Sequence, residues 1–252
     1  MKTLIVIPAR YGSTRLPGKP LLRSTGKYLV QHVYERACMA RCTHQVVVAT
    51  DDTRVAAAVA SFGGQAVMTG RDCETGTDRV AEVARKIDAD CYVNLQGDEP
   101  LVDVDAIDRL VDTLDSEPEG CLATLAAPIC DLDTLNNPNC VKVVCDNTGR
   151  ALYFSRSPIP FVRDGVPDFA ARPHHFLQHL GIYAYRKADL FALTALKPTA
   201  LENLEKHEQL RALHHGWSIA VGMVDQASRG VDTFEDYQRF VREYSEQKSR
   251  LG

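Results

Sequence analysis

The chain has 252 residues, enough to bury a hydrophobic core without disulfides or a structural metal. Hydrophobic residues make up 45% and charged residues 25%, ordinary values for a globular protein that exclude disordered, collagen-like and low-complexity chains. The formal net charge of −4 argues against a general nucleic-acid-binding protein, which would normally be basic.

Short apolar runs alternate with helix-like segments in the first half of the chain. Residues 4–7 form an apolar run that ends at Pro8, as expected of a buried parallel strand. Further strands are expected at 45–49, 66–68 and 91–95, and helices at about 29–40, 53–62, 77–86 and 104–114. This alternation predicts a mostly parallel sheet with helices on both faces.

After about residue 121 the segments become strand-like, with little helix between them. Strands are expected at 122–128, 141–146, 151–155 and 218–223, and helices near 201–213 and 233–244. The turn sequence at 146–149 predicts a hairpin. The chain therefore reads as a single α/β domain spanning 1–252, with a smaller sheet-rich insertion around 121–185.

Eight cysteines occur without any Cys-x-x-Cys pair, which argues against zinc-ribbon and thioredoxin-like proteins. The apolar start is cut off at Pro8, too early for a secretory signal or a membrane span. We therefore expect eight reduced, buried thiols in a cytoplasmic protein with no membrane partner.

Residues 8–20 form a loop with three cations, Arg10, Arg15 and Lys19, and with two glycines. Glycines let backbone amides approach an anion closely, and three cations suit a polyphosphate better than a single carboxylate. The spacing matches neither a Walker A loop nor a dinucleotide-binding motif. A solvated basic loop is the alternative, but ligands of open parallel sheets bind where strands end, which favours phosphate binding.

Two aspartates are candidate metal ligands. Asp98 follows the strand at 91–95, and Asp232 precedes the helix at 233–244. One or two carboxylates together with substrate phosphates are the usual ligands of Mg²⁺. Asp98 could instead be a turn residue. Asp232 could be a helix N-cap, which its position alone favours.

Two arginines and one strand-like segment stand out in the middle of the chain. Arg156 and Arg163 follow a strand and could bind a carboxylate, although surface arginines are commoner. His179 and Tyr183 fall on one face of a strand-like segment, where a structural buried histidine is the alternative.

Glu208 lies on the expected helix 201–213, on the same face as Leu201 and Leu204. A carboxylate in an apolar stripe needs a partner, because unpaired burial costs on the order of several kcal/mol. That partner is either a bound polar substrate or Arg211, one helical turn away.

Several segments, in order along nearly the whole chain, match the motifs of one enzyme family: 7–20, 48–51, 76–77, 94–100, 137–139, 141–144, 151–156, 179–183, 201–202, 208–211 and 230–233. The chain resembles the 3-deoxy-manno-octulosonate cytidylyltransferases, also called CMP-Kdo synthetases. The first of these segments is specific, and the others are strong as an ordered set.

The resemblance implies a sheet of the nucleotide-diphosphosugar-transferase type with a dimerisation insertion. It implies a reaction in which 3-deoxy-D-manno-octulosonate (Kdo) and CTP give CMP-Kdo and pyrophosphate, with Mg²⁺, for lipopolysaccharide biosynthesis. A homodimer is implied as well. Alternatives are cytidylyl transfer to another acid, such as 8-amino-Kdo, a nonulosonate or a phosphonate, and a non-catalytic nucleotide-binding module.

The resemblance also implies roles for individual residues. Those expected to bind the nucleotide are Pro8, Ala9, Arg10, Ser13, Arg15, Lys19, Thr75, Gly76, Arg79 and Gln96. Those expected to bind the sugar acid are Arg156, Arg163, His179, Tyr183, Glu208 and Gln209. Asp98 and Asp232 would ligate Mg²⁺ and would act in catalysis together with Lys19, without a covalent nucleophile. His207 stands where relatives usually have an apolar residue.

Overall fold

The structure is a computed structural model that describes residues 1–12, 15–73, 75–118, 120–171 and 174–251. The chain divides into two units, here called unit 1 (residues 1–107 and 228–252) and unit 2 (residues 108–227). The predicted sheet-rich segment, 121–185, lies inside unit 2.

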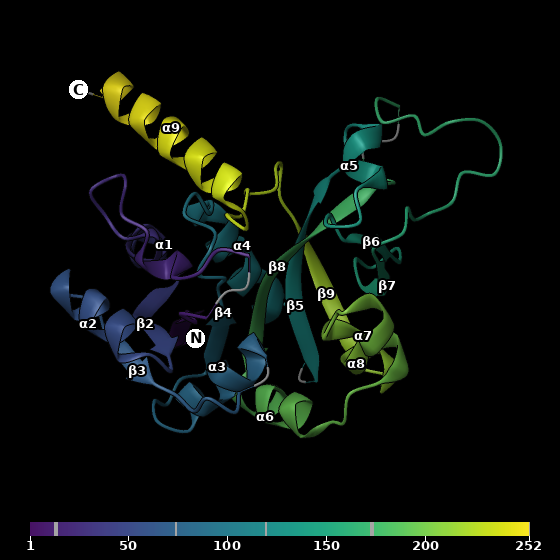
Figure 1. The fold of residues 1–252 in the computed structure, drawn as a ribbon. Coiled ribbons are helices and arrows are strands. Elements are labelled where there is room, and N and C mark those ends of the chain that lie inside the picture. Colours follow the sequence, from purple (N-terminus) through teal and green to yellow (C-terminus); the bar gives the residue numbers. More distant parts are fainter. Residues whose placement is uncertain (13–14, 74, 119, 172–173, 252) are drawn as a thin grey trace. The chain divides into compact units, whose positions relative to one another are not determined.

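Unit 1 contains a parallel sheet with the strand order β3-β2-β1-β4, which confirms the predicted α/β class (Figure 1). Its elements are β1 (Thr3–Pro8), the 3-10 turn η1 (Lys19–Leu21), α1 (Leu29–Met39), β2 (Thr43–Thr50), α2 (Thr53–Ser61), β3 (Ala66–Met68), α3 (Gly76–Ala84), β4 (Cys91–Asn94) and α9 (Phe234–Leu251). Helix α4 (Val104–Asp115) runs across the division between the units.

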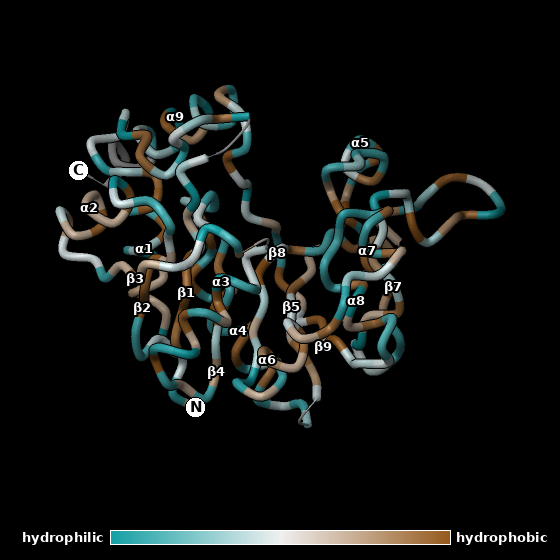
Figure 2. The backbone as a smooth tube through the Cα atoms, turned by 60° about the horizontal axis from the view of Figure 1, so that its bottom comes forward, coloured by the Kyte–Doolittle hydropathy of each residue, from teal (hydrophilic) through white to brown (hydrophobic). Residues whose placement is uncertain are grey.

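The apolar run of β1 forms the centre of this sheet. Its residues from Leu4 to Ile7 are at most 1% exposed, and the strand is largely brown in the hydropathy colouring of Figure 2. Pro8 of β1 lies opposite Ala49 of β2, and Val6 lies opposite Asn94 of β4. Because the strands are parallel and in this register, the loops after β1 and β4 leave from the same edge of the sheet.

Helix α9 packs on unit 1 through a small apolar cluster. Leu16 of the first loop, Leu29 of α1, Val231, and Tyr237 and Phe240 of α9 are all buried in it. The cluster ties the loop after β1 to the C-terminal segment, and both segments carry predicted site residues.

Unit 2 is built around strand β5, which pairs antiparallel with β8 and parallel with β9. The hairpin predicted at 146–149 is present, because β6 and β7 pair antiparallel on either side of it. The elements of unit 2 are β5 (Cys121–Pro128), α5 (Leu132–Asn136), β6 (Lys142–Cys145), β7 (Ala151–Ser155), β8 (Leu177–Arg186), α6 (Lys187–Ala195), α7 (Ala200–Glu205), α8 (Gln209–His214) and β9 (Ser218–Met223).

Two expectations from the sequence are wrong. The helix expected at 201–213 is two short helices, because Lys206 ends α7 in a left-handed conformation with a φ of 51°. The cysteines are free thiols as expected, but Cys38 and Cys130 are exposed rather than buried. Among the described residues, no helix is long and apolar enough to cross a membrane.

Candidate active site

The loop after β1 is folded so that Lys19 turns back towards the sheet. Gly18 adopts a left-handed φ of 69°, and its amide donates to the carbonyl of Tyr11 at 3.1 Å. A left-handed residue at this point favours glycine. Lys19 then begins the 3-10 turn. Ser13, predicted to bind phosphate, lies outside the described residues.

Asp98 and Asp232 are far apart in sequence, but backbone contacts bring them together. The turn after β4 comes so close to β1 that a Cβ on Gly97 would lie 2.7 Å from the carbonyl oxygen of Pro8, so only glycine fits there without a shift. The amide of Val231 donates to the carbonyl of Asp98 at 2.8 Å. This hydrogen bond places the two aspartates next to each other.

A single ammonium group joins the two carboxylates. Lys19 Nζ lies 2.6 Å from Asp98 Oδ2 and 3.3 Å from Asp232 Oδ1, and the Lys19 side chain is only 14% exposed. Arg15 also reaches Asp232 Oδ1, at 3.3 Å, with a largely exposed side chain. Four charged residues from three separate motifs therefore meet at one point.

The interpretation of Asp232 as a helix cap is wrong. Thr233 caps α9, because its hydroxyl oxygen accepts a hydrogen bond from the amide of Asp236 at 3.2 Å. The carboxylate of Asp232 faces Lys19 and Arg15 instead and is half exposed.

Glu99 is a further acidic residue at this edge, for which the sequence suggested no role. The hydroxyl of Ser228 donates to its Oε2 at 2.6 Å. Burial raises the pKa of Glu99 to about 7, and the charge of Asp98 acts in the same direction. Only its position directly after Asp98 could have drawn attention to it.

Several other residues predicted to bind the nucleotide lie at the same edge of the unit 1 sheet. Thr75 caps α3, and the next residue, Gly76, lies so close to Asn94 that an added Cβ would be 3.3 Å from its Nδ2 and 3.7 Å from Pro8 Cγ. Pro8 ends β1, and Ala9 extends it with a hydrogen bond to Ala49. Gln96 lies in the turn that follows β4.

Two predicted cations on this side are bound to the protein itself. Arg79 is fully buried, donates to Thr69 and lies 3.5 Å from the carboxylate of Asp51. Its Nε and Nη2 have no hydrogen-bond partner among the described residues. Arg10 is exposed and donates to the backbone carbonyl of Cys73.

In unit 2, His179 and Tyr183 of β8 are buried and lie within hydrogen-bond distance of each other. Thr124 of β5 lies opposite Tyr183 of β8, and the register between the two strands shifts directly after this pair. Thr124 Oγ1 lies 3.0 Å from His179 Nε2, and the Tyr183 hydroxyl lies 2.5 Å from the same nitrogen. Burial lowers the pKa of His179 well below its usual value and raises the pKa of Tyr183 well above its usual value, so both are neutral at pH 7.

Arg156 is fixed by backbone carbonyls. Its Nε donates to the carbonyl of Glu205 at 2.7 Å, and its Nη1 donates to the carbonyl of Pro138 at 2.8 Å. Burial lowers the pKa of His207 to about 4, and the charge of Arg156 acts in the same direction. The ring centroids of His207 and His179 lie 5.1 Å apart. Arg156 and His179 are thus connected through His207.

The local structure around Glu208 differs from the sequence prediction. Glu208 does not continue a helix from Leu201, because the chain turns at Lys206, so the apolar-stripe argument is wrong. The guanidinium of Arg211 forms a two-pronged contact with the carboxylate of Glu202, at 2.9 and 2.6 Å.

Gln209 begins α8, and its Oε1 is buried without a partner among the described residues. Arg163 is exposed and makes no hydrogen bond or ion pair with the part of the chain that the structure describes.

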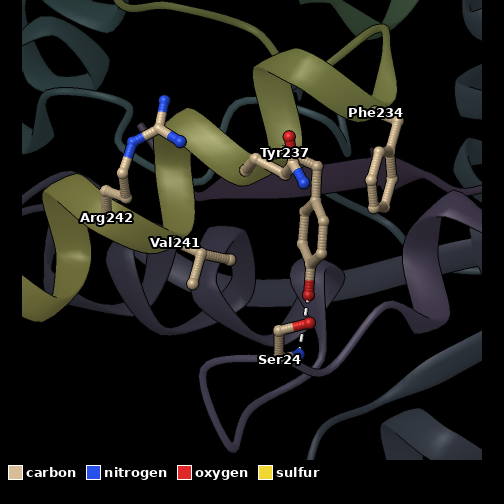
Figure 3. Close-up of a pocket in the computed structure, with 6 residues that line it drawn as sticks. Ser24, Phe234, Tyr237, Val241 and Arg242 are labelled. Carbon is tan, nitrogen blue, oxygen red and sulfur yellow. Dashed lines mark hydrogen bonds between the residues drawn. The ribbon is translucent and has the colours of Figure 1, made fainter.

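A pocket of about 300 Å³ lies along α9, where the Tyr237 hydroxyl accepts a hydrogen bond from the amide of Ser24 at 2.7 Å (Figure 3). Phe234, Val241 and Arg242 also line it. None of the predicted site residues that the structure describes lines this pocket, so it is separate from the charged cluster around Lys19.

Comparisons with known proteins assign the chain to a family. Residues 4–219 match a family model described as cytidylyltransferase. The chain is 52% identical to the 3-deoxy-manno-octulosonate cytidylyltransferase of Syntrophobacter fumaroxidans over 244 aligned residues, and this alignment covers 96% of each chain. It is 49% identical over 242 residues to that of Syntrophotalea carbinolica, covering 95% of this chain and 97% of the other. The chain belongs to the 3-deoxy-manno-octulosonate cytidylyltransferase family.

A solved structure agrees with this assignment to the cytidylyltransferases. CMP:2-keto-3-deoxy-manno-octonic acid synthetase in complex with CTP matches with a TM-score of 0.91 and 44% identity over 98% of this chain and all of the other. A 4-diphosphocytidyl-2C-methyl-D-erythritol synthase matches with a TM-score of 0.62 at 14% identity, which shows a shared fold alone.

Proposed function

We propose that this chain joins CTP to Kdo, giving CMP-Kdo and pyrophosphate, with Mg²⁺ as the metal. The observation that supports this most directly is the contact of Lys19 with both Asp98 and Asp232, in a chain of this family. A catalytically inactive nucleotide-binding module would not need two carboxylates held beside the phosphate-binding loop.

The cluster in unit 1 suits a triphosphate bound with a divalent metal. No group of three or more metal-binding side chains occurs among the described residues. Two carboxylates fit Mg²⁺, which usually keeps several waters and binds through one or two carboxylates plus substrate phosphates. Asp98 and Asp232 would hold the ion, which would neutralise phosphate charge and lower the pKa of the attacking hydroxyl.

Lys19 and Arg15 would move from the carboxylates to the phosphates when the nucleotide binds. In the reaction, the anomeric oxygen of Kdo forms a bond to the α-phosphorus, the bond to the β-phosphate oxygen breaks, and the hydroxyl proton is released. Positioning and charge neutralisation supply most of the catalysis of such transfers. The cations of the first loop would therefore stabilise the pyrophosphate as it leaves.

The sugar acid would be bound by residues of unit 2. Arg156 offers a guanidinium for the carboxylate, and His179 with Tyr183 offers neutral hydrogen-bonding groups for hydroxyls. Neutral groups suit hydroxyls because they need no counter-charge in a buried site.

The test is pyrophosphate release from CTP with Kdo, 8-amino-Kdo and a nonulosonate, each as the sole acceptor. We expect turnover with Kdo to exceed that with the others. Turnover with a nonulosonate and none with Kdo would reject the assignment of the acceptor.

The metal assignment has its own test. Asp98→Asn should lose Mg²⁺-dependent turnover and also bind Mn²⁺ more weakly in a direct titration. Asp105→Asn changes an exposed aspartate of unit 1 and serves as the matched control. Equal Mn²⁺ affinity in the two variants would show that Asp98 is not a ligand.

We further propose that the product supplies lipopolysaccharide synthesis, that the enzyme is a cytoplasmic homodimer, and that Glu208, Gln209 and Arg163 assist in binding the sugar acid. Family resemblance supports all of these. Sedimentation of the full chain tests the oligomeric state.

A further inference from the structure

Lys142, in strand β6 of unit 2, is a lysine with no exposed surface. Its Nζ donates to three backbone carbonyls, those of Asn137 at 3.0 Å, Cys140 at 2.7 Å and Arg156 at 2.6 Å. An ammonium has three N–H donors, so each donor has an acceptor. A buried charge is tolerated only when it is fully hydrogen-bonded, so this ammonium holds the three carbonyls in place.

These three carbonyls belong to Arg156 and to the turn that binds its guanidinium. Lys142 holds the carbonyl of Arg156 itself, and it also holds the turn on either side of Pro138. The carbonyl of Pro138 accepts the hydrogen bond from Arg156 Nη1 at 2.8 Å. Loss of the ammonium would therefore release both the backbone of Arg156 and one partner of its guanidinium.

Glu205 holds Arg156 from another direction. Its Oε2 accepts from the amide of Arg156 at 2.9 Å, and its Oε1 accepts from the hydroxyl of Ser155 at 2.7 Å. Its backbone carbonyl accepts from Arg156 Nε at 2.7 Å. Two hydrogen bonds, one from Nε and one from Nη1, thus hold the guanidinium in place.

The opposite edge of the guanidinium is left for a ligand. Arg156 Nη2 makes no hydrogen bond or ion pair with any residue that the structure describes. The two Nη groups of an arginine form a fork that matches a carboxylate when the plane of the guanidinium is held still.

We propose that Lys142 and Glu205 are positioning residues, which orient the Nη edge of Arg156 for the carboxylate of the sugar acid. This inference rests on the proposed function. Burial lowers the pKa of Lys142, but the three acceptors require the charged form, because a neutral amine has only two donors.

The test compares Lys142→Met, Glu205→Gln and the matched control Lys197→Met, an exposed lysine of the same unit. Misplacing a substrate-binding group by about 1 Å can lower the catalytic efficiency up to about 100-fold. We therefore expect the KM for Kdo to rise about 10- to 100-fold in Lys142→Met and in Glu205→Gln. The KM for CTP should stay within about twofold, because the nucleotide is bound by unit 1.

Combination with Arg156→Ala separates positioning from a general loss of structure. If Lys142 acts through Arg156, Lys142→Met should add almost nothing to the KM for Kdo once Arg156 is alanine. Additive effects, or equal rises in both KM values, would overturn the proposal. If circular dichroism shows that Lys142→Met does not fold, the same comparison of single and double variants, made with Glu205→Gln and Arg156→Ala, tests the proposal. A wild-type enzyme inactive with Kdo would refute the proposed function instead.

Discussion

Replacement of Lys19 by methionine removes the ammonium shared by Asp98 and Asp232 while keeping the length of the side chain. Its Nζ lies 2.6 and 3.3 Å from the two carboxylates, and the side chain is 14% exposed. A charge-assisted hydrogen bond of this kind contributes about 1.5–3 kcal/mol. If Lys19 moves to the phosphates of bound CTP, the substitution should weaken CTP binding about 10- to 150-fold.

The same change should have the opposite effect on the metal. Without nucleotide, the ammonium of Lys19 occupies the carboxylates that Mg²⁺ would bind. Lys19→Met should therefore bind Mg²⁺ more tightly than the wild type when CTP is absent, although it binds CTP more weakly. A general loss of structure would weaken the binding of both ligands, so tighter Mg²⁺ binding together with weaker CTP binding is not expected from it.

Isothermal titration with CTP, and with Mg²⁺ alone, measures both effects. The control is Lys27→Met, which also removes a lysine–carboxylate contact in unit 1, with Glu35 at 2.5 Å. A CTP affinity of Lys19→Met within about twofold of the control would refute the loop assignment, because the expected loss is at least tenfold. A lower Mg²⁺ affinity would show that Lys19 does not compete with the metal.

Three further predictions concern stability. Burial lowers the pKa of His32 to about 4, so the contribution of the neutral imidazole to stability is complete above about pH 6.5 and is lost as the pH falls towards 4. Urea unfolding should show that the free energy of unfolding falls by about 3 kcal/mol over this range, and His32→Phe should flatten this pH dependence. His207 Nε2 is buried without a partner among the described residues, so His207→Leu should raise the free energy of unfolding at pH 7 by about 1–3 kcal/mol, and an unchanged or lower melting temperature would contradict this. Glu202→Gln removes the carboxylate that contacts the buried Arg211 guanidinium at 2.6 Å and should lower the free energy of unfolding by about 3–5 kcal/mol; a loss below about 1 kcal/mol would show that the pair is not effectively buried.

The strands of the parallel sheet were predictable because their signal is local. The apolar run that ends at Pro8 and the run that precedes Gln96 each indicate where a strand ends. Parallel pairing then brings their ends to one edge, so the neighbourhood of the first loop and Asp98 followed from pattern alone. The break after α7 was not predictable, because Lys206 carries no glycine-like signal for its left-handed conformation.

The roles of single polar residues were less accessible. A carboxylate before a helix has the same local sequence whether it caps the helix or faces away from it, and Asp232 does the second. Lys142 gave no sign of being buried beneath three carbonyls, since its partners Asn137 and Arg156 belong to different segments. Family resemblance grouped Asp232 with Lys19, and the two side chains lie 3.3 Å apart, whereas composition and spacing did not suggest this pair.

The sequence by itself determined the α/β class, the cationic loop and the family, because periodicity and ordered motifs are written along the chain. Only the tertiary structure decided which charges meet. A hydrogen bond from the amide of Val231 to the carbonyl of Asp98 joins segments on opposite sides of unit 2 in the sequence. Such a contact depends on how the whole of unit 1 closes around its sheet, and no local pattern of residues encodes it.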